Sequence, residues 1–405
     1  MKKGILFVDD EPRVLDGLKR LLRGMRNDWD VYFATSGREA LERLNKEPVD
    51  VIVSDMLMPE MDGAYLLGEV MRRYPHTVRI ILSGQAERES VLNSVRHAHQ
   101  FLLKPCDMQT LKKSISRAGA LSDLLVNERL KKVLSRIQSV PALPAHYARL
   151  IDELGSPKAS IKDIGQIVSQ DMGMTAKVLQ LVNSAFFGLT QNVSNPAQAV
   201  SILGLNTIRA LVLSVKVFSM VNEDDLQRYE LTDIAEHCLA AGLLSKELAV
   251  MEHQDMNTVD EAFLSGVLHD CGKLMLAANL GEDYEAVVAY KRENHVTAWE
   301  AEKLVLGATH AEVGAYLLGV WGLPESIITA IMYHHEPEIY KNTQFHPLTA
   351  VHVADYLLRA MDISHTGEKV PSLSENYLFQ IDAYDRLPAW WEAGEMMIQD
   401  DANAT

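Results

Sequence analysis

The chain has 405 residues, of which 47% are hydrophobic and 23% charged, values typical of a globular protein large enough for two or three domains. No apolar run approaches the ~20 residues that span a bilayer, and acids closely follow the first apolar run, so the sequence predicts no membrane segment, no signal peptide and a cytoplasmic location. Residues 121–405 carry 20 basic and 38 acidic side chains, and a region so acidic disfavours direct binding to DNA.

Four short apolar runs in the first 120 residues are separated by stretches of helical periodicity. They cover residues 4–8, 49–53, 78–82 and 101–103. Strand and helix in alternation predict an α/β domain with a doubly wound parallel sheet. Such sheets bind their ligands beyond the carboxyl ends of the strands, so we expect the functional residues at those ends.

Three acids, a hydroxyl and a lysine follow these runs: Asp9, Asp10, Asp55, Ser83 and Lys104. Three carboxylates at one edge repel one another unless a hard cation such as Mg²⁺ lies between them. Asp55 can then attack a phosphoryl donor, while Lys104 and Ser83 contact the phosphoryl oxygens. The alternative is that these acids only cap helices, although five matching positions in order argue against it. The predicted product is an aspartyl phosphate.

The same residues resemble the receiver domain of two-component systems, which has a flavodoxin-like fold and would cover residues 1–120. The resemblance rests on Val8-Asp9-Asp10-Glu11, Asp55-Met-Leu-Met-Pro59, Leu82-Ser83-Gly84 and Lys104-Pro105. It implies a response regulator in a phosphorelay, phosphorylated on Asp55 by a sensor histidine kinase.

The resemblance also implies roles for neighbouring residues. Mg²⁺ would be bound by Asp10, Asp55 and the carbonyl of Leu57, with Asp9 acting through water. The Lys104–Pro105 peptide is expected to be cis. Phe101 stands at the position of the switch aromatic, and because phenylalanine has no hydroxyl, ring burial alone would report phosphorylation.

Residues 121–138 are predicted to form a linker helix, because their apolar residues recur three and four apart. Two interpretations remain open for it. The helix either couples the domains or forms a homodimer, or it is a plain connector packed on one domain. Pro141 and Pro144 end the helix and mark the entry to the next domain.

Residues 139–360 contain successive amphipathic patterns with short breaks, which predict an all-α domain. Residues 361–405 are predicted to form a C-terminal helical extension and tail, packed through Trp390 and Trp391.

Seven residues of this region are candidate metal ligands: His237, His269, Asp270, His310, His334, His335 and Asp355. Imidazoles and carboxylates on facing helices can hold one or two ions of the Fe, Mn or Zn type, which turn bound water into a nucleophile for phosphate esters. Lys273 is a candidate catalytic residue beside them. The alternative is a hydrogen-bonded polar cluster without metal.

The second domain resembles the HDOD family, the HD-related output domains. Three segments carry most of the resemblance: Ser139-Val-Pro-Ala-Leu-Pro144, Gly266-Val-Leu-His-Asp-Cys-Gly-Lys273 and His334-His335-Glu336-Pro337. It implies a multidomain regulator whose non-catalytic output acts through downstream signalling proteins. The candidate ligands also match those of cyclic-dinucleotide phosphodiesterases of the HD-GYP type, so a receiver-gated, metal-dependent phosphohydrolase is the alternative, although the Gly-Tyr-Pro signature is absent.

Overall fold

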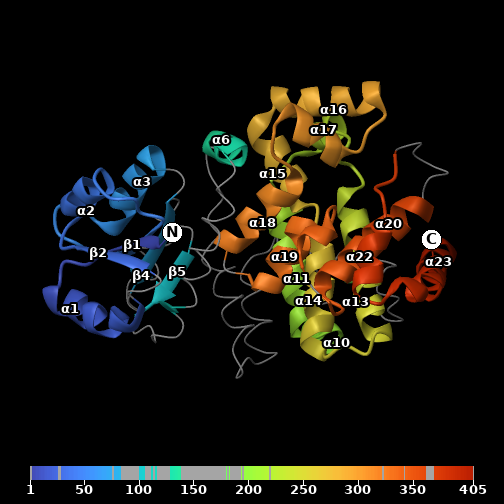
Figure 1. The fold of residues 1–405 in the computed structure, drawn as a ribbon, viewed down its shortest axis with the longest axis horizontal. Helices are drawn as coiled ribbons and strands as arrows, with labels where there is room; N and C mark the ends of the chain where they lie inside the picture. Colours follow the sequence, from blue (N-terminus) through green and yellow to red (C-terminus); the bar gives the residue numbers. More distant parts are fainter. Residues whose placement is uncertain are drawn as a thin grey trace. The chain divides into compact units, whose positions relative to one another are not determined.

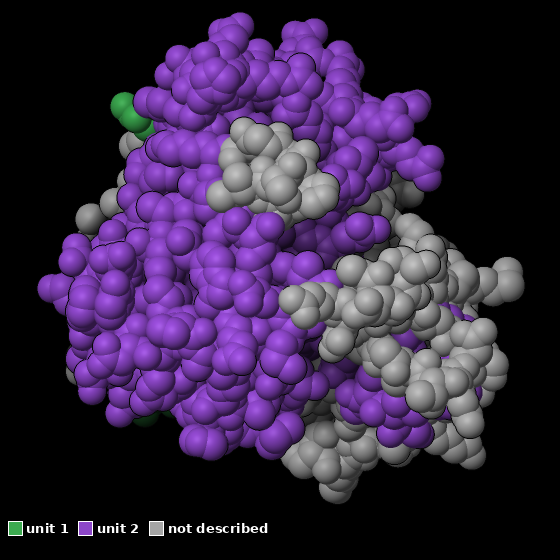
Figure 2. Space-filling model, turned by 90° about the vertical axis from the view of Figure 1, so that its right-hand side faces the viewer, with its two compact units in different colours: residues 1–145, 316–323 green, residues 146–315, 324–405 purple. Residues whose placement is uncertain are grey.

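The computed structural model describes residues 2–25, 29–74, 77–83, 100–104, 111, 112, 115, 128–137, 179, 182, 193, 196–218, 220–321, 323–341, 343–361 and 369–404. The chain divides into two compact units, one of residues 1–145 and 316–323 and one of residues 146–315 and 324–405 (Figure 2). Each unit has a hydrophobic core of its own.

Five parallel strands form the sheet of the first unit, in the order β2-β1-β3-β4-β5 (Figure 1). They are β1 (Lys3–Val8), β2 (Trp29–Ala34), β3 (Val51–Asp55), β4 (Val78–Ser83) and β5 (Gln100–Leu103). This order is that of flavodoxin-like folds, and it confirms the predicted doubly wound α/β domain. The four predicted runs correspond to β1, β3, β4 and β5.

Strand β2 was absent from the prediction. It lies at the edge of the sheet, where only its end residues Trp29 and Ala34 are buried. An edge strand that is half exposed does not show the continuous apolar run of a central strand, so the apolar pattern alone could not locate it.

Helices cover both faces of this sheet: α1 (Pro12–Leu21) and η1 (Leu22–Met25), then α2 (Gly37–Leu44) and α3 (Gly63–Arg73). Side chains alternate along β1, so that Leu6 belongs to the core cluster of α2 and α3, while Ile5 belongs to the cluster of α1. Each face of the sheet therefore has its own apolar layer. Farther along, α6 (Glu128–Arg136) lies within the predicted linker helix.

The second unit is helical throughout its described residues, which confirms the predicted all-α domain (Figure 1). Its elements are α10 (Pro196–Leu203), α11 (Leu205–Phe218), α12 (Glu223–Arg228), α13 (Ile234–Met251), α14 (Met256–Leu268), α15 (Cys271–Leu280), α16 (Glu282–Asn294), α17 (Ala298–Val305), the first part of α18 (His310–Val320), α19 (Glu325–Tyr333), η4 (Pro337–Ile339), α20 (Pro347–Met361), α22 (Glu375–Gln380), η5 (Tyr384–Arg386) and α23 (Leu387–Ala404). The segment 139–144, which the sequence analysis also considered, lies outside the described residues.

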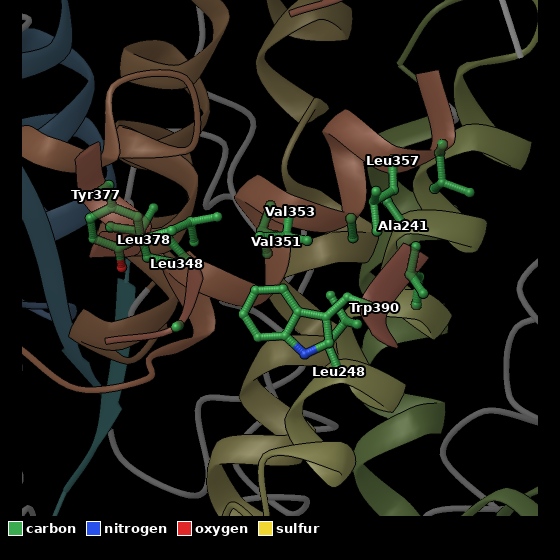
Figure 3. Close-up of a cluster of buried hydrophobic side chains, with 14 of the residues drawn as sticks. Ala241, Leu248, Leu348, Val351, Val353, Leu357, Tyr377, Leu378 and Trp390 are labelled. Carbon is green, nitrogen blue, oxygen red and sulfur yellow. The ribbon is translucent and has the colours of Figure 1, made fainter. Parts of the chain in front are cut away.

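The C-terminal helices complete the core of the second unit. Trp390 of α23 is fully buried in the cluster that joins α13, α20 and α22 (Figure 3). The same cluster includes Leu248 and Tyr377. Trp391, the other predicted packing residue, is only partly buried. None of the described helices is both long enough and apolar enough to cross a membrane.

Candidate functional site

The first candidate site lies at the carboxyl ends of the strands. Asp9 directly follows β1, Asp55 is the last residue of β3 and Lys104 directly follows β5. Because β1 and β3 are neighbours in a parallel sheet, their carboxyl ends deliver both acids to the same edge. The topology thus brings together residues that are up to 95 positions apart in the sequence.

The geometry of this acid cluster is tight. Carboxylate oxygens of Asp9, Asp10 and Asp55 all lie within 4.8 Å of one another. The Nζ atom of Lys104 is 2.5 Å from Oδ1 of Asp55 and 2.9 Å from Oδ2 of Asp9. Oxygen donors at this spacing are the set that a hard divalent cation prefers, so these three residues fit Mg²⁺.

Burial governs the electrostatics of the cluster. It raises the pKa of the Asp55 carboxyl above its ordinary value, and the ammonium of Lys104 only partly opposes the rise. Burial lowers the pKa of Lys104, but the carboxylates of Asp55 and Asp9 outweigh it and raise that pKa overall. One lysine therefore does not neutralise the three acids, and an additional cation would stabilise their ionised forms.

The other predicted receiver residues are placed in part. Leu57 is 58% exposed in the loop that follows β3. Ser83 ends β4 and Phe101 lies in β5, but their side chains are outside the described part of the structure, as is Pro105. The predicted roles of these residues remain predictions.

The second candidate site is a buried histidine cluster, which we define as the seven predicted ligands His237, His269, Asp270, His310, His334, His335 and Asp355. Three helices, the junction between α14 and α15, and the segment that follows α19 deliver them. His237 is on α13, Asp355 on α20 and His310 at the start of α18. The pair His269-Asp270 joins α14 to α15, and the pair His334-His335 follows α19.

Two glycines allow the helices to approach closely enough to form this cluster. A Cβ atom on Gly266 would lie 2.7 Å from the backbone of Gly242, so α14 can pack against α13 only with glycine there. A Cβ atom on Gly272 would lie 1.9 Å from the carbonyl oxygen of His310, which brings α15 against α18. The glycine spacing around His269-Asp270 is therefore a packing requirement of the site.

One half of the cluster contains His237, His269 and Asp355, whose ligating atoms lie within 4.8 Å of one another. Oδ1 of Asp355 is 2.9 Å from Nε2 of His237 and 3.5 Å from Nε2 of His269. The last distance is too long for a strong hydrogen bond, and Nε2 of His269 is a buried atom without a hydrogen-bond partner.

The other half contains Asp270, His310, His334 and His335, again within 4.8 Å. Nε2 of His310 lies 3.1 Å from Oδ1 of Asp270 and 3.0 Å from Nε2 of His335. Oδ1 of Asp270 and Nε2 of His334 are buried and lack hydrogen-bond partners. Buried polar atoms are almost always satisfied, so two such atoms facing one cluster indicate a missing positive partner.

Further contacts orient the imidazole rings. Nδ1 of His269 lies 2.7 Å from the carbonyl oxygen of Gly266, and Nδ1 of His334 lies 2.7 Å from that of Ile331. Both rings therefore donate through Nδ1 and present Nε2 to the cluster. His310 is held in the same way by a carboxylate, that of Glu302, at 2.6 Å.

The histidines of the cluster differ in the direction of their pKa shifts. Burial lowers the pKa values of His334 and His335 well below the ordinary value, and it lowers that of His237 to about 4 with help from the Arg359 guanidinium. Burial alone would also lower the pKa of His269, but the neighbouring Asp270 carboxylate raises it well above the ordinary value. Three of the histidines are therefore neutral at pH 7, which is the form that ligates a metal.

Three charged side chains around the cluster decide how it is neutralised, and two of them were not predicted. The guanidinium of Arg359 lies 2.8 Å from Asp355 and 3.1 Å from Asp270. The Glu302 carboxylate is fully buried and also accepts the backbone N–H of His310 at 2.7 Å. Arg359 stands four residues after Asp355 on the same helix, a spacing that could have revealed it, whereas Glu302 carries no such signal.

Lys273, the third of these side chains, was predicted as a candidate catalytic residue. Its Nζ atom lies 2.6 Å from Oδ2 of Asp270, and its side chain is only 8% exposed. In this arrangement it neutralises a buried carboxylate and holds it in place. Its predicted catalytic role remains untested.

Two families match the chain. The model of the response regulator receiver domain matches residues 5–116, and the model of the HDOD domain matches residues 140–337. The chain contains a response regulator receiver domain and an HDOD domain. Both resemblances inferred from the sequence are confirmed.

Individual relatives cover this regulator in part. An uncharacterised protein of Treponema pallidum (strain Nichols) is 26% identical over 243 residues, which cover 59% of this chain and 46% of the relative. The transcriptional regulatory protein GlrR of Escherichia coli (strain K12) is 35% identical over 151 residues, 36% of this chain and 33% of GlrR. The chain thus spans between a third and a half of these curated relatives.

A solved structure supports the fold of the second unit. An HDOD domain protein from Geobacter sulfurreducens is 23% identical, with a TM-score of 0.51, and the match covers 65% of the regulator and 92% of that protein. At this identity the likeness shows a shared fold.

Proposed function

We propose that the regulator is switched by phosphorylation of Asp55 and that its HDOD domain is a non-catalytic output that acts through protein interactions. The observation that carries the first part is the bridge from Lys104 to both Asp55 and Asp9 at the carboxyl edge of the sheet. A sensor histidine kinase would supply the phosphoryl group, and downstream signalling proteins would bind the output.

The charges at Asp55 support this chemistry. Asp10, Asp55 and the Leu57 carbonyl would hold Mg²⁺, with Asp9 acting through water, and the ion would neutralise the incoming phosphoryl oxygens. The Asp55 carboxylate supplies the nucleophilic oxygen, and the ammonium of Lys104 already lies within ion-pair distance of it. Lys104 can therefore pair with a phosphoryl oxygen after only a small movement.

The new charge is large enough to act as a switch. A phosphoryl group adds nearly two negative charges at the buried Asp55 side chain, and such a change biases any surface that has two accessible arrangements. In this proposal Ser83 and Phe101 respond to the phosphoryl group, and the helix that contains α6 transmits the change, either as a coupling element or by forming a homodimer.

Arg359 is the reason to prefer a non-catalytic output. A guanidinium remains charged at all physiological pH values, and this one contacts carboxylates that would otherwise ligate a metal. A hydrolytic centre needs an ion with an open coordination position for water. Arg359 fills this part of the centre with a fixed positive charge that cannot activate water.

A metal-dependent phosphohydrolase that acts on a nucleotide or cyclic dinucleotide is the second candidate. The convergence of all seven predicted ligands in one buried cluster favours it. In that case the receiver would gate hydrolysis, and Lys273 would contact the substrate.

Labelling by a small phosphodonor tests the first part of the proposal. The wild-type chain incubated with acetyl phosphate and Mg²⁺ should gain one phosphoryl group by mass spectrometry, and Asp55→Asn should gain none. Asp16→Asn, which alters an exposed acid on α1, is the matched control and should label like the wild type. Equal labelling of Asp55→Asn would show that another residue accepts the phosphoryl group.

Turnover assays distinguish the two outputs. The full-length protein, with and without phosphodonor, is assayed against a generic phosphodiester and cyclic di-GMP in the presence of Zn²⁺, Mn²⁺ or Fe²⁺. We expect no turnover. Hydrolysis that disappears in His269→Ala would replace the non-catalytic proposal with the phosphohydrolase.

A further inference from the structure

The buried histidine cluster is asymmetric, because the two oxygen atoms of the Asp270 carboxylate have different kinds of partner. Oδ2 of Asp270 faces two cations, Nζ of Lys273 at 2.6 Å and the Arg359 guanidinium at 3.1 Å. Oδ1 of the same carboxylate faces His310 and has no hydrogen-bond partner. One oxygen is therefore fully neutralised, while the other is left for a further positive group.

On the Oδ2 side, the guanidinium of Arg359 contacts the ligating atoms themselves. Besides both carboxylates, it lies 3.1 Å from Nε2 of His237. An ion bound by His237, His269 and Asp355 would have to displace Arg359, because two cations at this separation repel strongly in a buried site. This half of the cluster is already neutralised by a side chain.

On the Oδ1 side, the donor atoms are spaced for one ion. Ligand distances of about 2.0–2.1 Å in a tetrahedral zinc site place neighbouring donor atoms about 3.3 Å apart. Nε2 of His310 lies 3.1 Å from Oδ1 of Asp270 and 3.0 Å from Nε2 of His335. The unpartnered Nε2 of His334, a residue only 1% exposed, belongs to the same group.

The surroundings of His310 favour a metal in this half. Its Nδ1 atom faces Oε2 of Glu302 at 2.6 Å, and the same oxygen accepts the backbone N–H of His310. A carboxylate behind a histidine ligand fixes the ring and increases the basicity of the atom that binds the metal. The other half has no equivalent carboxylate among the contacts that the structure describes.

We propose that the cluster binds a single borderline transition-metal ion of the Zn²⁺ class through Asp270, His310, His334 and His335, while Arg359 replaces a second ion beside His237, His269 and Asp355. The four protein ligands close the coordination shell and leave no position for water, as in structural zinc sites. The ion joins the start of α15 to α18 and to the end of α19, and so stabilises the output domain. This inference goes beyond the proposed function and does not depend on Asp55.

Metal stoichiometry of the full-length protein tests this arrangement. The protein is stripped with a chelator, dialysed into millimolar Mg²⁺ so that the oxygen-only receiver site holds Mg²⁺, and titrated with Zn²⁺. Elemental analysis and calorimetry should give one Zn²⁺ per chain, and the thermal unfolding midpoint of the helical domain should rise. No bound Zn²⁺, or two ions in the wild type, would overturn the proposal.

Variants in the two halves should behave differently. His334→Ala should lower the affinity for Zn²⁺ at least 100-fold, whereas His237→Ala should still bind one ion. Arg359→Met should bind a second ion, because it frees Asp355 and His237 while keeping an apolar stem. Loss of the ion in His237→Ala, or an unchanged stoichiometry in Arg359→Met, would refute the division of the cluster.

Two further variants protect the test against misfolding. Glu302→Gln keeps the shape of the buried side chain and should weaken Zn²⁺ binding 10–100-fold without abolishing it. His295→Ala removes an exposed histidine outside the cluster and should leave the affinity unchanged. Equal affinity of Glu302→Gln and the wild type would contradict the support that the Glu302 carboxylate is proposed to give His310.

Discussion

The contact between α15 and α18 makes Gly272→Ala the most informative stability test. A Cβ atom on Gly272 would lie 1.9 Å from the carbonyl oxygen of His310 and 2.8 Å from the backbone nitrogen of Gly314. Both obstacles are backbone atoms, so no side chain can rotate away. Ordinary van der Waals contact begins near 3.4 Å, and the two helices must therefore separate by about 1.5 Å.

The magnitude follows from the kind of obstacle. Overpacking a core typically costs 1–3 kcal/mol, and a clash with backbone belongs at or above the upper end of this range. We expect the free energy of unfolding to fall by about 3 kcal/mol. For a domain of this size, each kcal/mol corresponds to roughly 2–4 °C, so the unfolding midpoint of the helical domain should fall by about 6–12 °C.

Differential scanning calorimetry of the full-length, metal-free protein measures this effect. Gly394→Ala is the matched control in the same unit, because its added Cβ would come close only to the flexible end of the Met361 side chain, at 2.9 Å, and would make ordinary contact with Leu244 at 3.7 Å. We expect that control to change the free energy of unfolding by less than about 1 kcal/mol. A midpoint for Gly272→Ala within 2 °C of the wild type would show that the helices are not as closely packed as described.

Two further predictions concern the same unit. Trp390→Ala removes a fully buried indole from the C-terminal core and should lower the free energy of unfolding by denaturant by about 3–5 kcal/mol. Phe379→Ala removes a residue that is 60% exposed and should lower it by about 1 kcal/mol or less. Similar losses for the two variants would contradict the placement of α23. His346 accepts the Leu348 backbone N–H through Nδ1 at 3.1 Å, and burial lowers its pKa to about 4. Because the folded-state pKa lies below the unfolded value of about 6.5, its contribution to stability is present above pH 6.5 and is lost as the pH falls to about 4. His346→Asn keeps a hydrogen-bond acceptor but does not titrate. Between pH 6.5 and 4 this variant should therefore take up about one proton fewer on unfolding than the wild type. If the free energy of unfolding of the variant depended on pH as in the wild type, His346 would not titrate in that range.

Many residues of the candidate sites could be predicted from the sequence, because they stand where a strand or helix pattern ends. Asp9, Asp55 and Lys104 each follow an apolar run, and parallel strands end at one edge, so the sequence pattern already implied their convergence. The missed strand β2 shows the limit of this reasoning. Its half-exposed residues do not form an apolar run, because an edge strand packs on fewer neighbours than a central one.

The amino-acid sequence by itself determined the two domain types, the order of the functional residues and the presence of seven metal-capable side chains, because strand ends, helix periods and motif spacings are local properties. Only the tertiary structure decided how the buried cluster is neutralised. Glu302 and Arg359 act on residues from different helices, and their effect depends on separations of about 3 Å that no local pattern encodes. In a buried site these separations determine whether a metal ion or an arginine neutralises a carboxylate, because the Coulomb interaction there is only weakly screened by water.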